Sequence, residues 1–259
     1  MHVHPGIEEL GRVYSPHLAI HATPTAFAAA LDHLDLKEAA RGDADTAHAD
    51  YLEWTEMPTE QPGGVNFGAV MVWLREYLPA NAMLCNGAGN YAAWIHRFFR
   101  FRRFGSHVAP ASGSMGYGVP AAVAMKRLHP DRPVVCLAGD GDFLMNGQEF
   151  ATAVQYGVAV VVVIADNGMY GTIRMHQERE YPGRISATDL RNPDFSAYAR
   201  AFGGFGVSVE RTEDFPEAFK QALACGKPAI IRLAIDGEAI TPTTTIAKIR
   251  AKALADRKR

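Results

Sequence analysis

From residue 65 onward, short hydrophobic runs alternate with segments of helical periodicity, and this alternation limits the possible folds more than any other feature. The hydrophobic runs have the length of strands and few polar residues, as strands do when helices cover both faces of a sheet. Because short links join runs and helices, successive strands run parallel. We predict an α/β fold with three layers, a mostly parallel sheet with helices on both faces. The expected strands are 82–86, 133–139, 158–165, 205–210 and 228–235, and the expected helices are 67–78, 91–99, 118–128, 147–157, 194–203 and 214–226.

Both ends of the chain depart from this alternation. Residues 1–62 hold two short strand-like runs and a helix, too few to close a core, and then an acid-rich stretch ending in Pro-Gly-Gly. We interpret 1–62 as the remnant of another domain plus a helical linker, and 63–240 as the main domain. The remaining residues, 241–259, are interpreted as a basic tail that forms a solvated helix or a frayed end.

Composition excludes several classes of partner. The 259 residues include 26 Lys and Arg against 28 Asp and Glu, and the net charge of -2 gives no general attraction to nucleic acid or membrane lipid. The longest apolar run, 158–165, is too short to span a bilayer, and the first residues do not have the pattern of a signal peptide. The three cysteines lie far apart in sequence, and Cys85 and Cys136 lie in strand-like runs, as buried thiols do in a reducing compartment. We expect a cytoplasmic protein that acts on small molecules.

Two of the predicted strands end in polar residues that could hold a cation. One ends in GDGD (139–142), and the next along the chain is followed by DNG (166–168). The carboxylate of Asp140, the amide oxygen of Asn167 and a backbone carbonyl form a set of oxygen ligands that suits Mg²⁺ or Ca²⁺ rather than zinc. Mg²⁺ is usually completed by water and substrate phosphates, so a protein that offers few oxygens implies a phosphorylated ligand. Either turn alone is explained more simply as a link between a strand and a helix. Together, 27 positions apart (167 − 140), they predict a site for a divalent cation and a phosphorylated ligand.

The segment GDGDFLMNGQEFATAVQYGVAVVVVIADNGMYG (139–171) resembles the thiamine diphosphate-binding motif of the acetolactate synthase, pyruvate oxidase and benzoylformate decarboxylase group. The resemblance covers about residues 63–240 and implies the fold of that group's C-terminal, diphosphate-binding domain. It implies that Asp140, Asn167 and the main-chain carbonyl of Met169 hold Mg²⁺, which bridges the two phosphates of the cofactor.

The same resemblance implies which residues bind thiamine diphosphate itself. Backbone amides of the two turns would meet the phosphates. Asp142 stands where the group usually has Ser, so we expect its side chain to face solvent or to cap the following helix. The implied phosphate-binding residues are Gly139, Gly141, Asp142, Tyr170 and Gly171.

A second segment, APASGSMGYGVPAA (109–122), resembles the loop that holds the cofactor in a bent shape. By this resemblance Met115 is the apolar wedge between the two rings, with Gly113 and Ser114 beside it, and the carbonyl of Gly113 accepts from the 4′-amino group. Without the first motif, the loop would be interpreted as a Gly-rich link with Met115 in the core. In this resemblance Asn90 and Tyr91 fall in a loop over the diphosphate.

A rival interpretation comes from the segment that follows the strand at 82–86. Gly87, Gly89 and Ala92 fit the G-x-G-x-x-[GA] pattern of dinucleotide-binding proteins. That pattern also requires an acid about 20 residues later. The sequence has arginines there instead, so an NADP-binding, Rossmann-like protein remains an alternative.

The resemblance implies a Mg²⁺-dependent 2-oxo acid carboligase or decarboxylase, a transferase or lyase that forms a homodimer or tetramer. In this group a Glu on a pyrimidine-binding domain activates the cofactor, so the catalytic residue of this chain is unknown. Residues 1–62 resemble the end of the group's middle domain, and we expect a truncated or cleaved protein rather than a small subunit whose partner carries the pyrimidine-binding domain. We then expect little or no activity from the isolated chain. A non-catalytic module that kept the cofactor fold is the other alternative.

Overall fold

The structure, a computed structural model, describes residues 1–34 and 42–257 and divides the chain into two compact units, Met1–Asp50 and Tyr51–Arg259. Part of the predicted linker (35–41) and the last two residues of the predicted tail lie outside the described residues.

The first unit is small and has little interior. Two short strands, β1 and β2, pair in parallel, and none of the described residues up to 34 is fully buried. This agrees with the expectation that these residues cannot close a core alone. The elements are β1 (His2–His4), η1 (Ile7–Glu9), β2 (Ala19–His21) and α1 (Pro24–Leu31), followed by α2 (Ala44–Glu56), which continues into the second unit.

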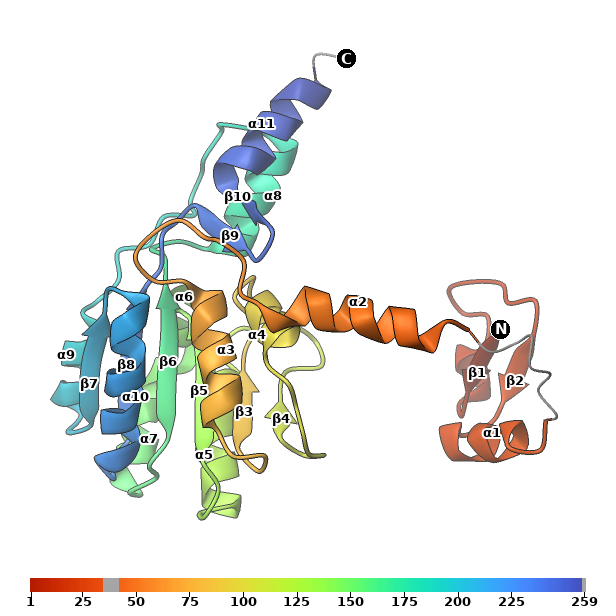
Figure 1. Ribbon diagram of the computed structural model, residues 1–259, viewed down its shortest axis with the longest axis horizontal. Helices are drawn as coiled ribbons and strands as arrows, with labels where there is room; N and C mark the ends of the chain where they lie inside the picture. Colours follow the sequence, from red (N-terminus) through yellow and green to blue (C-terminus); the bar gives the residue numbers. More distant parts are fainter. Residues whose placement is uncertain (35–41, 258–259) are drawn as a thin grey trace. The chain divides into compact units, whose positions relative to one another are not determined.

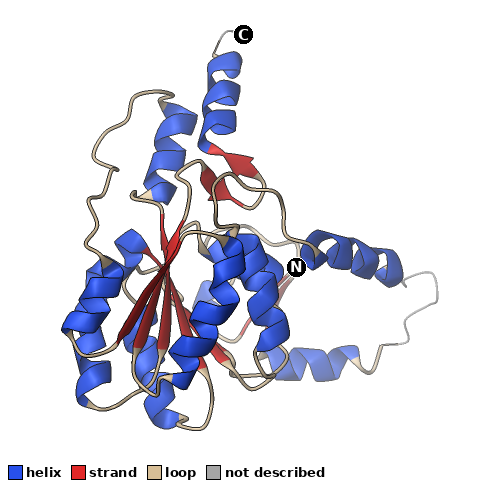
Figure 2. Cartoon of the chain, turned by 60° about the vertical axis from the view of Figure 1, so that its left-hand side comes forward, coloured by secondary structure: helices blue, strands red, loops and turns tan. Residues whose placement is uncertain are grey.

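The second unit contains a six-stranded parallel sheet in the order β4-β3-β5-β6-β8-β7, between two layers of helices (Figures 1 and 2). This confirms the predicted α/β fold. The strands are β3 (Met83–Asn86), β4 (His107–Val108), β5 (Val134–Gly139), β6 (Val161–Asp166), β7 (Phe205–Val209) and β8 (Ala229–Ala234). The two-residue edge strand β4 is absent from the sequence prediction, because so short a run has no measurable periodicity.

Alternate residues of the central strands face two separate hydrophobic cores. On one face Leu137 and Val163 pack under α3, α4 and α10, and on the other Ala138 and Ile164 pack under α5, α7 and α9. A strand buried on both faces needs apolar residues at every position, which explains the continuous hydrophobic runs. The helices are α3 (Phe67–Tyr77), α4 (Ala92–Phe98), α5 (Gly118–Leu128), α6 (Asp140–Asn146), η3 (Gly147–Glu149), α7 (Phe150–Gln155), α9 (Phe195–Ala201), η4 (Thr212–Asp214) and α10 (Phe215–Ala224).

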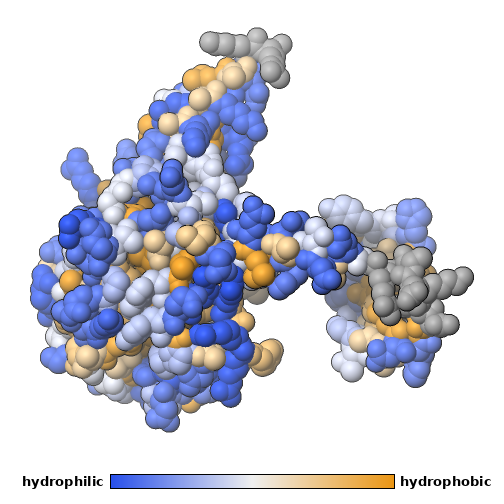
Figure 3. All heavy atoms as spheres, viewed as in Figure 1, coloured by the Kyte–Doolittle hydropathy of each residue, from blue (hydrophilic) through white to orange (hydrophobic). Residues whose placement is uncertain are grey.

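The surface and the cysteines fit this layered arrangement. The face of the sheet-containing unit seen in Figure 3 is mostly hydrophilic, as expected when the apolar sides of the helices are turned toward the sheet. Cys85 and Cys136 are buried free thiols.

Among the described helices, none combines the length and the apolar character needed to cross a bilayer. The cytoplasmic location stays a prediction.

The predicted basic tail is largely folded. Its residues contribute to a hairpin of β9 (Ala239–Thr241) and β10 (Thr244–Thr245) and form α11 (Ile246–Asp256), which packs against α8 (Gly171–Glu180). The guanidinium of Arg250 donates to both carboxylate oxygens of Glu178 (2.8 and 2.5 Å), and these bonds hold the pKa of Glu178 below its usual value. The basic composition of the tail predicted a solvated helix or a frayed end, and it gives no sign of this docking.

We predict that Arg250→Ala releases α11 from α8. The side chain of Glu178 is 1% exposed, so the variant leaves a carboxylate with little access to water and without its cationic partner. Hydrogen exchange should show the α11 amides losing protection by at least about tenfold. Lys252→Ala, an exposed change on the same helix, is the control. Equal protection in the two variants would contradict the assigned contact.

Candidate functional site

The carboxyl ends of β5 and β6 meet at one edge of the sheet. The two strands are hydrogen-bonded neighbours up to Gly139 and Ala165, and the amide of Gly168 donates to Oδ2 of Asp140 (2.9 Å). In a parallel sheet this edge is where ligands bind. The sequence expectation that the two polar turns lie together is therefore met in the structure.

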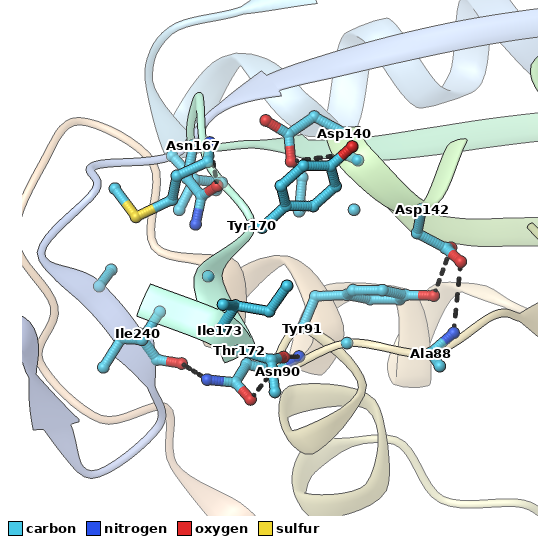
Figure 4. Close-up of a pocket in the computed structure, with 18 of the residues that line it drawn as sticks. Ala88, Asn90, Tyr91, Asp140, Asp142, Asn167, Tyr170, Thr172, Ile173 and Ile240 are labelled. Carbon is cyan, nitrogen blue, oxygen red and sulfur yellow. Dashed lines mark hydrogen bonds between the residues drawn. The ribbon is translucent and has the colours of Figure 1, made fainter. Parts of the chain in front are cut away.

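A pocket of about 90 Å³ opens beside these turns (Figure 4). Its walls come from the turns after β3, β5 and β6, from the first turn of α8 and from apolar side chains that include Phe67, Trp94 and Ile240. Of the residues that the resemblance assigned to the cofactor or the metal, Gly113 and Ser114 do not line it. The others do: Asn90, Tyr91, Met115, Gly139, Asp140, Gly141, Asp142, Asn167, Met169, Tyr170 and Gly171.

Asp140 is a buried carboxylate with no cationic partner among the described residues. It is 3% exposed, and burial raises its pKa to about 6, against the hydrogen bonds from Asn192 and Gly141. The neighbouring carboxylate of Asp166 differs, because Nε of Arg232 donates to it (2.8 Å). Oδ1 of Asp140 has one recorded donor, the amide of Gly141 (2.9 Å), and so keeps capacity for a further ligand.

Two more oxygen atoms lie on the β6 side of the pocket. Oδ1 of Asn167 accepts a hydrogen bond from the amide of Met169 (3.2 Å). The carbonyl of Gly168 is used by the amide of Leu190, whereas no hydrogen bond is recorded for the carbonyl of Met169 within the described residues. The described residues contain no group of three or more His, Cys, Asp or Glu side chains placed for a metal. A cation here would therefore depend on one carboxylate with amide and carbonyl oxygens, the donor set that Mg²⁺ accepts.

Donors for an anion come from the start of α8. The first helical residues, Gly171, Thr172 and Ile173, line the pocket, and no side chain caps their amides. Uncapped amides at a helix start favour phosphate oxygens. The structure does not support a free donor at Tyr170, because its amide donates to the carbonyl of Thr188 (2.8 Å). The amide of Gly141 is likewise engaged, by the side chain of Asp140.

The side chain of Asp142 corrects the sequence expectation. It neither faces solvent nor caps a helix: it is 3% exposed and accepts hydrogen bonds from the amides of Ala88 (3.3 Å) and Gly116 (2.7 Å) and from the hydroxyl of Tyr91 (2.7 Å). Burial raises the pKa of Asp142, while these three bonds act to lower it. The side chain of Asp is longer than that of Ser and reaches two loops that are distant in sequence. A local sequence pattern could not predict these contacts.

In the loop that carries the dinucleotide pattern, two backbone amides that could bind a pyrophosphate are already hydrogen-bonded within the protein. The amide of Ala88 is bound by Asp142, and the amide of Asn90 donates to the hydroxyl of Thr172 (3.1 Å). The side chain of Asn90 is engaged as well, donating to the carbonyl of Ile240 and accepting from Thr172 (Figure 4). Two backbone amides of the loop after β3, those of Ala88 and Asn90, are therefore already hydrogen-bonded within the protein and are not free to hold a pyrophosphate.

The loop that carries Met115 reaches the pocket with one side chain. Met115 lines the pocket and is 38% exposed, so its side chain is accessible to a ligand. Gly113 has a φ of 69°, so its carbonyl direction is one that glycine allows easily. The hydroxyl of Ser114 lies 2.8 Å from that of Ser112 at the surface.

Asn192 is a site residue that the sequence analysis missed. Its Nδ2 donates to Oδ2 of Asp140 and to Oδ1 of Asp166 (both 2.7 Å), and so it separates two carboxylates. Its own Oδ1 is buried, and no described residue donates a hydrogen bond to it. The residue lies in the loop before α9, and only the short Asn-Pro turn marks it in the sequence.

Residues 87–233 match the family described as "Thiamine pyrophosphate enzyme, C-terminal TPP binding domain". An acetolactate synthase large subunit of Parasynechococcus marenigrum is 38% identical over 164 residues, 62% of this chain and 26% of that protein. A sulfoacetaldehyde acetyltransferase of Alcaligenes xylosoxydans xylosoxydans is 30% identical over 205 residues, 77% of this chain and 32% of that protein.

Solved structures agree with these matches. The thiamine diphosphate-dependent 4-hydroxybenzoylformate decarboxylase of Rhodococcus jostii RHA1 superposes with a TM-score of 0.74 at 26% identity, over 91% of this chain and 43% of that chain. The present chain thus spans between a quarter and a half of the length of these relatives.

We predict that Asn192→Ala destabilises the protein when no divalent cation is present. The change removes the shared donor between Asp140 and Asp166, and a buried hydrogen bond to a charged group is worth about 1.5–3 kcal/mol. Chemical denaturation measures the loss, with Arg191→Ala, the exposed neighbour, as the control. Equal stability of the two variants would show that Asn192 does not hold the carboxylates.

Proposed function

Because the chain belongs to the thiamine pyrophosphate enzyme family and carries its C-terminal TPP-binding domain, we propose that it binds thiamine diphosphate through Mg²⁺ and serves 2-oxo acid chemistry. The observation that carries the proposal is Asp140, a buried carboxylate at the meeting point of two strand ends for which the described part of the chain offers no cationic partner. A bound cation would offset the free-energy cost of burying the negative charge of Asp140 away from water.

Three oxygen atoms would hold the magnesium ion. They are the carboxylate of Asp140, the side-chain oxygen of Asn167 and the main-chain carbonyl of Met169. Their support is that all three residues line one pocket and that Oδ1 of Asp140 and the Met169 carbonyl keep acceptor capacity. The amide of Met169 donates a hydrogen bond to the side-chain oxygen of Asn167. This hydrogen bond would lengthen or open when the Asn167 oxygen turned toward an ion.

The phosphates would lie against the first turn of α8. The uncapped amides of Gly171, Thr172 and Ile173 support this placement, and the positive end of the helix dipole favours the same anion. The bound amides of Tyr170 and Gly141 leave α8 as the main source of free donors.

The remainder of the cofactor would extend past Met115, whose half-exposed side chain is placed to support a ring. Among the residues that line the pocket there is no glutamate. The activating Glu implied by the sequence resemblance would therefore come from elsewhere, on a pyrimidine-binding domain of the same or another polypeptide. Turnover would require that domain, and a dimer or tetramer would supply it.

When bound, thiamine diphosphate supplies a carbanion nucleophile and an electron sink for 2-oxo acids. The protein would position the diphosphate, exclude water with the apolar wall formed by Phe67, Trp94 and Ile240, and leave the reactive end facing the other domain. The relatives named above include a synthase, an acetyltransferase and a decarboxylase, so carboligation and decarboxylation are both within the proposal.

We predict that Asp140→Asn abolishes Mg²⁺-dependent binding of thiamine diphosphate. The variant keeps the shape of the side chain and removes the charge that holds the ion. Affinity measured by calorimetry should fall by about 100-fold or more, since loss of residues that merely support metal ligands already costs 10- to 100-fold.

The matched control is Asp131→Asn, which changes an exposed carboxylate of the same unit. Its affinity should equal that of the wild-type chain. If the wild-type chain gives no Mg²⁺-dependent heat, the proposal is wrong, and a non-catalytic module with the cofactor fold becomes the better interpretation.

A further inference from the structure

The carboxylate of Asp142 joins three parts of the pocket wall. Asp142 lies in the first turn of α6, and its oxygens accept from Ala88 and Tyr91 in the loop after β3 and from Gly116 in the loop before α5. All three bonds are formed by a side chain that is 3% exposed. Hydrogen bonds to a buried carboxylate are among the stronger ones in proteins, so this contact is able to fix both loops.

The backbone amide and the backbone carbonyl of Gly116 are both hydrogen-bonded to side chains of α6. Its amide donates to Asp142, and its carbonyl accepts from Nδ2 of Asn146, four residues further along the helix (3.1 Å). Gly116 has a φ of 81°, and a β-carbon there would lie 2.7 Å from Cβ of Met145. The amide of Gly116 belongs to the peptide bond that follows Met115. The hydrogen bonds of Gly116 to Asp142 and Asn146, here called the clasp, therefore fix the backbone next to the Met115 side chain, which enters the pocket.

The other loop approaches Asp142 just as closely. A β-carbon at Gly87 would lie 2.1 Å from Oδ1 of Asp142, so only glycine allows the backbone of this loop to come so near. Gly87 therefore has a role that does not depend on a dinucleotide. The same loop supplies Tyr91, whose hydroxyl reaches Oδ2 and whose ring lies in the pocket wall (Figure 4).

We propose that Asp142 is a positioning residue that holds the Ala88–Tyr91 loop and the Met115–Gly116 peptide in the arrangement that the cofactor needs. The inference rests on the proposed function for its ligand, but the contacts themselves exist without one. Loops fixed before binding lose less conformational freedom when the ligand arrives, and affinity rises accordingly.

Hydrogen exchange of the full 259-residue chain without cofactor tests the clasp. In Asp142→Ala the amides of Ala88 and Gly116 should exchange at least about tenfold faster. In Asp142→Asn they should stay close to wild type, because the amide oxygen still accepts from both and its nitrogen donates to the Tyr91 hydroxyl. If the Ala variant does not fold, Asp142→Ser replaces it, since a hydroxyl this short cannot reach both loops.

Phe143→Leu is the matched control on the same helix. Phe143 is buried against Phe195 and makes no polar contact with either loop, so the change loosens packing alone. Faster exchange at Ala88 and Gly116 in Asp142→Ala than in this control, reversed in Asp142→Asn, supports the positioning role. Equal exchange in both, or an Asn variant as loose as the Ala variant, overturns it.

Calorimetry with thiamine diphosphate and Mg²⁺ separates this inference from the proposed function. We expect the dissociation constant to rise about tenfold in Asp142→Ala and to stay within about twofold in Asp142→Asn. If the wild-type chain binds and the Ala variant binds equally well, the positioning role is wrong and the proposed function stands. If the wild-type chain does not bind, the proposed function falls, and the exchange experiment still decides whether Asp142 holds the loops.

Discussion

The hydrogen bond between Asp140 and the amide of Gly168 joins the ends of two neighbouring strands, and the rest of the site is built around it. Because β5 and β6 are parallel and adjacent, their carboxyl ends bring a carboxylate and an amide side chain to one place. Burying Asp140 without a cation is costly, and Asn192 offsets part of that cost by donating to it. The divalent ion of the proposed function would supply Asp140 with the positive charge that none of the described residues provides.

The sequence was sufficient for the sheet and for much of the pocket. Strands buried on both faces need continuous apolar runs, so Val134–Gly139 and Val161–Asp166 could be located within a few residues. Parallel strands end at the same edge, so Asp140 and Asn167 could be placed together before any coordinates were known. Both predictions depend on periodicity and chain direction, which are local properties of a sequence.

Other features depend on contacts between distant residues, and no local pattern specifies these. The three partners of Asp142 lie 54, 51 and 26 positions away in the sequence, and Asn192 lies 52 positions from Asp140. Arg250 docks α11 through Glu178, although the composition of that helix suggested a solvated end. In each case one polar side chain contacts residues that are distant in the sequence. Such contacts are defined only once the strands and helices have their positions in the fold.

The central claim is that one divalent ion binds between the ends of β5 and β6 and holds a diphosphate against α8. Crystals grown with Mn²⁺ and thiamine diphosphate test it directly, because the anomalous signal of manganese locates the ion. The account predicts a peak within coordination distance of the Asp140 carboxylate and the Asn167 side-chain oxygen, with phosphate density beside the first turn of α8. A peak elsewhere, or diphosphate bound with both of these oxygens still in their present hydrogen bonds, would contradict it.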